Sequence, residues 1–163
     1  MRSAPWRNPR ITPRSGPSSH FHERAGSGKI LHVVAAIIER RGAILLAQRG
    51  QGQDQAGLWE FPGGKVEAGE SQPQALQREL DEELGLRCRV SDYVASSTLH
   101  LPGKRIHLHA WRVQPEGGEP EAREHAALCW VAPCQAQTYD LAPADRPLLQ
   151  AYLDLLARFH ADA

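Results

Sequence analysis

The alternation of apolar and polar positions is most regular after residue 29, where two apolar runs predict a β-hairpin. The first run, ILHVVAAIIE at 30–39, is rich in β-branched residues, and the second, AILLAQ at 43–48, is also of strand length. The short segment 40–42 between them ends in glycine and predicts a tight turn. A loop rich in glycine and glutamine, 50–57, then leads into LWEFPGGK at 58–65.

The second half of the chain predicts three further strands and a closing helix. Strands are expected at 90–100 and 105–113, joined by a Pro-Gly turn, and another at 127–132. Apolar residues recur at helical spacing from 146 to 159, which predicts an amphipathic helix. Its apolar positions are Leu148, Leu149, Tyr152, Leu155, Leu156 and Phe159.

A further helix is predicted between Gln72 and Leu84. Ser71 is a suitable N-cap with Gln74 at the capping-box position, and Gly85 supplies a left-handed stop. The predicted order begins with strands and has one helix in the middle of the chain and one at its end. This order indicates an α/β domain in which a mixed sheet lies between helices. We expect this domain to occupy residues 29–160.

The segment 1–28 has a different composition from the rest. It is rich in Arg, Pro, Ser and Gly, contains no acidic residue before Glu23 and lacks hydrophobic periodicity. Such a segment offers too little apolar surface to offset the entropy lost on ordering, so we predict a disordered tail.

The charge balance narrows the classes of function. The 19 basic residues match the 19 acidic ones, so no net field favours duplex nucleic acid or an acidic membrane, and stable nucleic-acid binding is not expected.

The cysteines of the chain, Cys88, Cys129 and Cys134, are odd in number and scattered, as is typical of reduced thiols in a cytoplasmic protein. His125 near the last two could suggest zinc, but the spacing favours incidental thiols.

The middle helix carries an unusual density of carboxylates. At about 100° per residue, Glu79, Glu82 and Glu83 occupy an arc beside the one that carries its leucines. Like charges at this spacing repel, and the helix contains no lysine to relieve them. A solvated acidic face is one explanation; a site for a hard cation such as Mg²⁺, which prefers oxygen ligands, is the other.

The same segment resembles the signature of the Nudix hydrolases, which reads G, five residues, E, seven residues, R-E-U-x-E-E-x-G-U, where U is a bulky aliphatic residue. Every position of that signature is met between residues 64 and 86. The matching residues are Gly64, Glu70, Arg78, Glu79, Leu80, Glu82, Glu83, Gly85 and Leu86. VVAAIIE, ILLAQR, LWEFPGGK and IHLHAW extend the resemblance to the MutT-type branch and, within it, to the subfamily of CTP pyrophosphohydrolases.

This resemblance implies an α/β/α sandwich and a metal-dependent hydrolase. The metal, Mg²⁺ or Mn²⁺, would be held by Glu79, Glu82 and Glu83 together with the carbonyl of Gly63. Glu124 corresponds to a loop carboxylate that assists as base, although it could be a solvated charge. Four other residues of the signature would maintain the shape of the loop and helix: Gly64, Glu70, Arg78 and Gly85. Among them, Glu70 and Arg78 would form an ion pair.

Substrate contacts are expected outside the signature. The resemblance implies a phosphate-binding role for Arg49 and a substrate contact for Phe61. Strand alternation places His107 and His109 on one face, where they could meet a nucleobase or simply be exposed. Asp145, if ionised, can accept a hydrogen bond from an amino group such as cytosine N4, or it can cap the last helix.

We therefore expect hydrolysis of nucleoside or deoxynucleoside triphosphates to the monophosphate and pyrophosphate, with CTP, dCTP or a modified nucleotide as substrate. The alternatives are 8-oxo-dGTP hydrolysis, ADP-ribose hydrolysis, for which Pro102 is a possible marker, and a non-enzymatic nucleotide sensor. The nucleotide is the expected partner of a cytoplasmic monomer or homodimer that does not bind membranes.

Overall fold

The protein was analysed as a computed structural model, which describes residues 28–161. The predicted disordered tail therefore lies outside the described residues, apart from Gly28. No helix among the described residues is long and apolar enough to cross a membrane.

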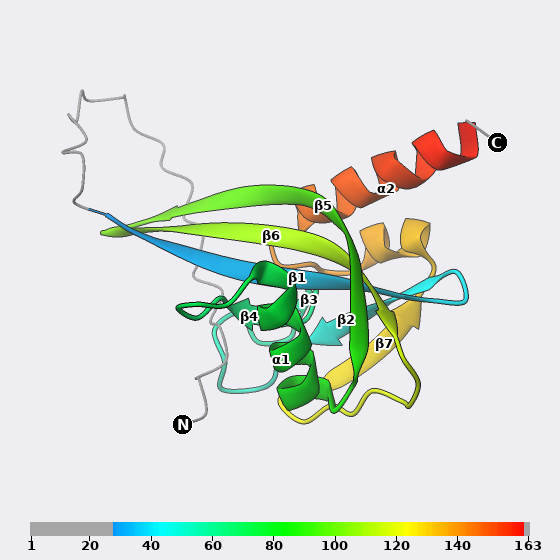
Figure 1. Cartoon of the computed structure of the whole chain (residues 1–163), viewed down its shortest axis with the longest axis horizontal. Helices are drawn as coiled ribbons and strands as arrows, with labels where there is room; N and C mark the ends of the chain where they lie inside the picture. The colour runs from blue at the N-terminus through cyan, green and yellow to red at the C-terminus, as the bar shows by residue number, and fades with distance from the viewer. Residues whose placement is uncertain (1–27, 162–163) are drawn as a thin grey trace.

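Seven strands and two α-helices make up the described chain (Figure 1). The strands are β1 (Lys29–Arg40), β2 (Ala43–Gln48), β3 (Trp59–Glu60), β4 (Gly63–Lys65), β5 (Cys88–Leu101), β6 (Lys104–Pro115) and β7 (Ala127–Val131). The helices are α1 (Gln72–Leu84) and α2 (Arg146–Ala161), and a short 3₁₀ helix spans Pro133–Thr138. The predicted strands and helices are thereby confirmed to within a few residues, whereas β3, β4 and the 3₁₀ helix were not predicted.

The sheet is mixed, as expected, and β1 is its centre. β1 pairs in parallel with β6 over ten residues, from Lys29↔Lys104 to Ile38↔Val113, and antiparallel with β4. At its far end β1 turns into β2, which pairs with β3 and β7, while β5 pairs with the outer edge of β6. Pro102 lies in the β5–β6 hairpin turn, with Gly103 at φ 73°.

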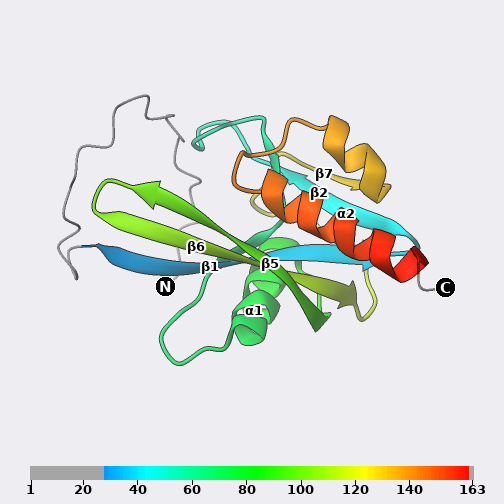
Figure 2. The same ribbon diagram turned by 90° about the horizontal axis from the view of Figure 1, so that it is seen from above.

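The continuous apolar run of β1 is explained by burial on both of its faces. Val33, Ala35 and Ile37 join the core under α2, and Val34, Ala36 and Ile38 join a second core under α1. Figure 2 shows the two helices on opposite sides of the sheet. A strand buried on both faces has no polar side to alternate with, so its sequence reads as apolar throughout.

Candidate active site

Helix α1 begins and ends where its sequence predicts. Ser71 Oγ accepts a hydrogen bond from the Gln74 backbone N–H at 3.2 Å, and the Gln74 side chain accepts one from the Ser71 N–H at 2.9 Å. Gly85 adopts the left-handed conformation at φ 61°, and its N–H reaches the Asp81 carbonyl at 3.0 Å. These caps fix the rotational position of the helix and hence the direction of its carboxylates.

The three carboxylates of α1 differ in their environment. Glu79 and Glu83 are buried at 6% and 4% exposure, because they point toward the sheet beside the leucines that anchor the helix. Glu82 is exposed to solvent. The side of the helix that carries these three carboxylates is therefore only partly exposed to solvent. Two of the three are buried in the protein.

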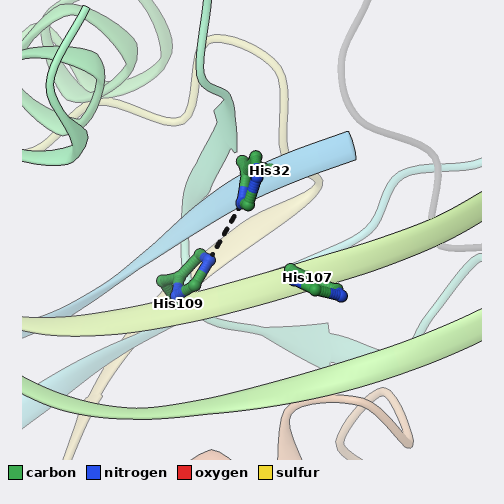
Figure 3. Close-up of side chains that lie close together, drawn as sticks. All are labelled: His32, His107 and His109. Atoms are coloured by element: carbon green, nitrogen blue, oxygen red, sulfur yellow. Dashed lines mark hydrogen bonds between the residues drawn. The ribbon is translucent and has the colours of Figure 1, made fainter. Parts of the chain in front are cut away.

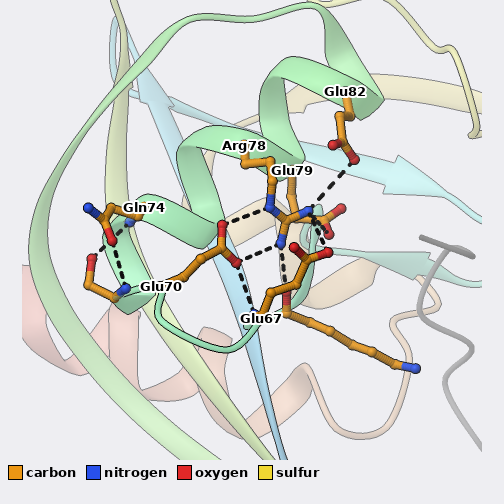
Figure 4. A network of polar contacts seen from close by, with 8 residues as sticks. Glu67, Glu70, Gln74, Arg78, Glu79 and Glu82 are labelled. Carbon is orange, nitrogen blue, oxygen red and sulfur yellow. Dashed lines mark hydrogen bonds and ion pairs between the residues drawn. The ribbon is translucent and has the colours of Figure 1, made fainter. Parts of the chain in front are cut away.

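Arg78 joins the loop before α1 to the helix itself (Figure 4). Its guanidinium makes two hydrogen bonds to the Glu70 carboxylate, at 2.8 and 2.9 Å, and a third to the Lys65 carbonyl at 2.9 Å. It also binds Glu79 at 2.8 Å and lies 3.7 Å from Glu82. The predicted ion pair between Glu70 and Arg78 is present, and its geometry orients a carboxylate of the expected metal site as well.

The glycines of β4 are required by close approach. A Cβ on Gly63 would overlap the backbone carbonyl of Val34, and a Cβ on Gly64 would overlap the carboxylate of Glu79. Only glycine leaves room for β4 to lie against β1 and for Glu79 to lie against β4. The two glycines thus bring the backbone of β4 next to the carboxylates of α1.

A pocket opens beside Gly63. It is lined by residues of β1, β3, β4, β6 and α1, by the loops after β2, β3 and β6, and by the residue before α2. The lining residues are Val33, Val34, Ala35, Gln53, Glu60, Phe61, Gly63, Glu83, Leu108, Glu124, His125 and Asp145. The pocket brings together five residues that the sequence singled out: Phe61, Gly63, Glu83, Glu124 and Asp145.

Negative charge dominates this pocket. Burial, together with the charges of Glu79, Glu60 and Glu124, holds the pKa of Glu83 well above its usual range, although the Gly63 N–H offsets part of the shift. Burial also raises the pKa of Glu79, against the opposing effect of Arg78. Among the described residues, Oε2 of Glu83 has no hydrogen-bond partner. Clustered carboxylates with an unsatisfied buried oxygen fit a divalent cation with oxygen ligands.

Asp145, the residue before α2, also lines the pocket and is 1% exposed. Its backbone carbonyl accepts the first helical hydrogen bond of α2, from the Leu149 N–H at 3.0 Å, while its carboxyl accepts one from the Phe61 N–H. Burial and Glu60 hold the pKa of Asp145 well above its usual range, with Arg49 opposing. Its Oδ2 has no partner among the described residues, so one oxygen is available to a ligand.

Arg49, the expected phosphate-binding residue, directly follows β2 and is buried. It is 2% exposed, and its guanidinium donates to Glu60 at 2.9 Å and to the Asp54 carbonyl at 2.7 Å. It therefore supports the pocket wall and the loop 50–57 from behind rather than facing solvent.

Sequence reasoning missed Glu60 as a pocket residue and did not place His125 there. Glu60 also contacts His125 Nε2 at 3.2 Å, so it connects two walls of the pocket. The signal for Glu60 was a single acidic residue inside the apolar segment LWEF. His125 is thus engaged by a carboxylate rather than by the cysteines, which are all free.

His107 and His109 are not brought to this pocket. Leu108 lines it, and alternation along β6 directs the histidines on either side of Leu108 to the other face of the sheet. The pocket therefore contains Asp145 but neither of these histidines.

The fold and the intact carboxylate signature define a Nudix hydrolase: the family model for the NUDIX domain matches residues 28–152, and the chain belongs to this family. The chain is 58% identical over 134 residues to the CTP pyrophosphohydrolase of Escherichia coli K12, covering 82% of this chain and 99% of that protein. It is 48% identical over 121 residues to the putative 8-oxo-dGTP diphosphatase 2 of Mycobacterium tuberculosis H37Rv, covering 70% and 82%.

A solved structure agrees with this assignment. The solution structure of the E. coli ORF135 protein superposes with a TM-score of 0.74 at 57% identity, covering 82% of this chain and 95% of that one. The family match over residues 28–152 extends well beyond the signature at residues 64–86.

Proposed function

We propose that this Nudix hydrolase converts nucleoside triphosphates to the monophosphate and pyrophosphate, with CTP or dCTP as its preferred substrate. The observation that carries the proposal is the pocket, which is lined both by Glu83 of α1 and by the buried Asp145. The 58% identity to a CTP pyrophosphohydrolase over nearly all of that protein supports the same substrate class.

Glu79, Glu82 and Glu83 would hold Mg²⁺ or Mn²⁺, with the adjacent backbone of Gly63 as a further candidate ligand. When bound, the cation supplies charge neutralisation for the phosphate oxygens and Lewis acidity toward water. Arg78 orients Glu79 through its 2.8 Å hydrogen bond, and Gly64 leaves the space in which that carboxylate lies.

Glu124 is the proposed proton acceptor. It lines the pocket from the loop after β6, close enough to raise the pKa of both Glu79 and Glu83 by its charge. Water adds to a phosphorus atom, its proton passes to the Glu124 carboxylate, and the α–β anhydride bond breaks. The nucleoside monophosphate and pyrophosphate then leave.

Asp145 is the proposed base-recognition residue. Its raised pKa means that the carboxyl retains its proton to higher pH than an exposed aspartate does. The oxygen available to a ligand is Oδ2, which in the protonated form of Asp145 could donate to cytosine N3 and in the ionised form could accept from cytosine N4.

Hydrolysis of 8-oxo-dGTP is the second candidate, supported by the 48% identity to a putative 8-oxo-dGTP diphosphatase. A carboxyl that both donates and accepts can also pair with an oxidised purine, so Asp145 alone does not separate the two substrates.

The three free cysteines are compatible with a cytoplasmic nucleotide pool as the place where the protein acts.

Steady-state kinetics would test the proposal. Pyrophosphate release is measured in Mg²⁺ for CTP, dCTP, 5-substituted dCTPs, 8-oxo-dGTP and ADP-ribose, with the products identified. We expect the highest kcat/KM for a cytosine nucleotide. A clear preference for 8-oxo-dGTP would overturn the substrate assignment, and absence of any turnover would overturn the reaction.

A further inference from the structure

Three histidines gather on the sheet, away from the pocket. His32 comes from β1, and His107 and His109 come from β6 (Figure 3). The parallel register pairs His32 with His107 and Val34 with His109, so all three side chains lie on the face that α1 covers further along. His32 is exposed and the other two are half-buried, which leaves the group open to solvent on one side.

The spacing of the ring nitrogens matches a metal site. One nitrogen from each ring lies within 4.8 Å of the others, and Nδ1 of His32 is 3.2 Å from Nε2 of His109. Zn–N bonds of about 2.0–2.1 Å in a tetrahedral site place neighbouring ligand nitrogens about 3.3 Å apart. Two of the three nitrogens are therefore already at ligand spacing, and a nitrogen of His107 lies within 4.8 Å of both.

The surroundings of His109 favour a ligand role. The Tyr93 hydroxyl lies 3.1 Å from Nδ1 of His109, so that nitrogen can carry the proton while Nε2 keeps its lone pair toward His32. Metal-binding histidines are commonly oriented in this way by a polar partner on the other nitrogen. Burial and the two neighbouring histidines lower the pKa of His109, which favours the neutral ring that a metal requires.

We propose that His32, His107 and His109 form a binding site for Zn²⁺, with a fourth position open to water. Imidazole nitrogen suits Zn²⁺ and related transition metals, whereas the carboxylates of α1 suit Mg²⁺, so the two sites select different ions. Bound Zn²⁺ would cross-link β1 to β6 on the side of the sheet opposite to Leu108. This site is independent of the proposed reaction.

Zinc binding to the full chain tests the site, with excess Mg²⁺ present to occupy the carboxylates. Calorimetric titration compares wild type with His32→Ala, and with His160→Ala as a matched exposed control on α2. We expect wild type and His160→Ala to bind one equivalent of Zn²⁺ that His32→Ala does not bind. Equal stoichiometry and affinity in all three proteins would overturn the proposal.

Two further measurements separate a metal site from a simple histidine cluster. Tyr93→Phe should weaken Zn²⁺ binding by roughly 10-fold through loss of the partner on His109, and Co²⁺ in place of Zn²⁺ should give the visible absorption of a tetrahedral nitrogen site. An octahedral Co²⁺ spectrum that is unchanged in His32→Ala would contradict the assignment. Mg²⁺-dependent turnover of His32→Ala should equal that of wild type, which keeps this test distinct from that of the proposed reaction.

Discussion

Two carboxyl groups in the pocket, Glu83 and Asp145, are almost out of contact with water. Each has one oxygen without a hydrogen-bond partner among the described residues, and burial raises the pKa of both. Their proposed roles differ, because Glu83 belongs to α1 together with Glu79, whereas Asp145 directly precedes α2. Each can be tested by an amide substitution that keeps the side chain's shape.

Glu83→Gln should lower turnover by about 10²–10³-fold, since loss of a metal-binding carboxylate removes several kcal/mol of transition-state stabilisation. Without divalent cations, its melting temperature at neutral pH should equal or exceed that of wild type, because the buried charge is gone. Pyrophosphate release and thermal melts in EDTA check both effects. The exposed Glu116→Gln serves as control, and near-full turnover by Glu83→Gln would refute the metal assignment.

Asp145→Asn should change the pH dependence of stability. The folded state holds the Asp145 proton more tightly than the unfolded chain, so this carboxyl stabilises the fold most at low pH. That contribution is lost as pH rises from the usual carboxyl pKa toward the raised one. Urea unfolding over a pH series should show the variant gaining stability relative to wild type in that interval; a constant difference would contradict the burial argument.

For the three carboxylates of α1, the sequence predicts their position on the helix but not their burial. Their arc and the ion pair of Arg78 follow from helical spacing and the signature. Which of them are buried does not, because burial depends on how closely β4 approaches the helix. The buried position of Arg49 could not be predicted either, since its partner Glu60 lies in a strand that the sequence pattern did not reveal.

At the scale of helices and strands, the length of an element decides whether its hydrophobic periodicity can be detected in the sequence. β1, β2, α1 and α2 contain enough positions for a period to appear, and their predicted bounds are confirmed within two residues. β3 has two residues and β4 has three, too few to distinguish alternation from chance. These short strands nevertheless carry Glu60, Gly63 and Gly64, so the least predictable elements build much of the site.

Gly64→Ala tests the junction between β4 and α1. The added methyl group would overlap the Glu79 carboxylate, so we expect turnover to fall at least about 10-fold as Glu79 is displaced, together with a loss of stability of about 1–3 kcal/mol. Gly50→Ala is the control, because its nearest neighbours would lie 3.9 Å from the new Cβ. Equal effects of the two substitutions would show that close approach to Glu79 is not the cause.

At the scale of the whole molecule, a polar network attaches α2 to the sheet. Glu39 of β1 accepts hydrogen bonds from Tyr152 of α2 at 2.6 Å, from Arg112 at 3.1 Å and from Gln114 at 2.8 Å. These bonds hold the pKa of Glu39 below its usual range despite partial burial. None of these residues lines the pocket, so the network concerns stability rather than chemistry.

Tyr152→Phe should lower the free energy of unfolding by about 1.5–3 kcal/mol, the usual worth of a hydrogen bond to a charged group. Its turnover below the melting transition should match that of wild type. Urea unfolding measures the first effect, with Tyr139→Phe as control because that hydroxyl contacts only the Cys129 sulfur among the described residues, at 3.4 Å. A loss of activity without a loss of stability would contradict this separation.

The central position of β1 has a consequence for how the protein is made. β1 is synthesised early, yet the parallel partner that covers one edge of it, β6, emerges from the ribosome only after α1 and β5. Until then the run Val33–Ile38, apolar on both faces, lacks its longest pairing partner and resembles the segments that drive aggregation of nascent chains. Early cover from the β2 and β4 hydrogen bonds is local and rapid, whereas pairing with β6 must wait for a long loop to close.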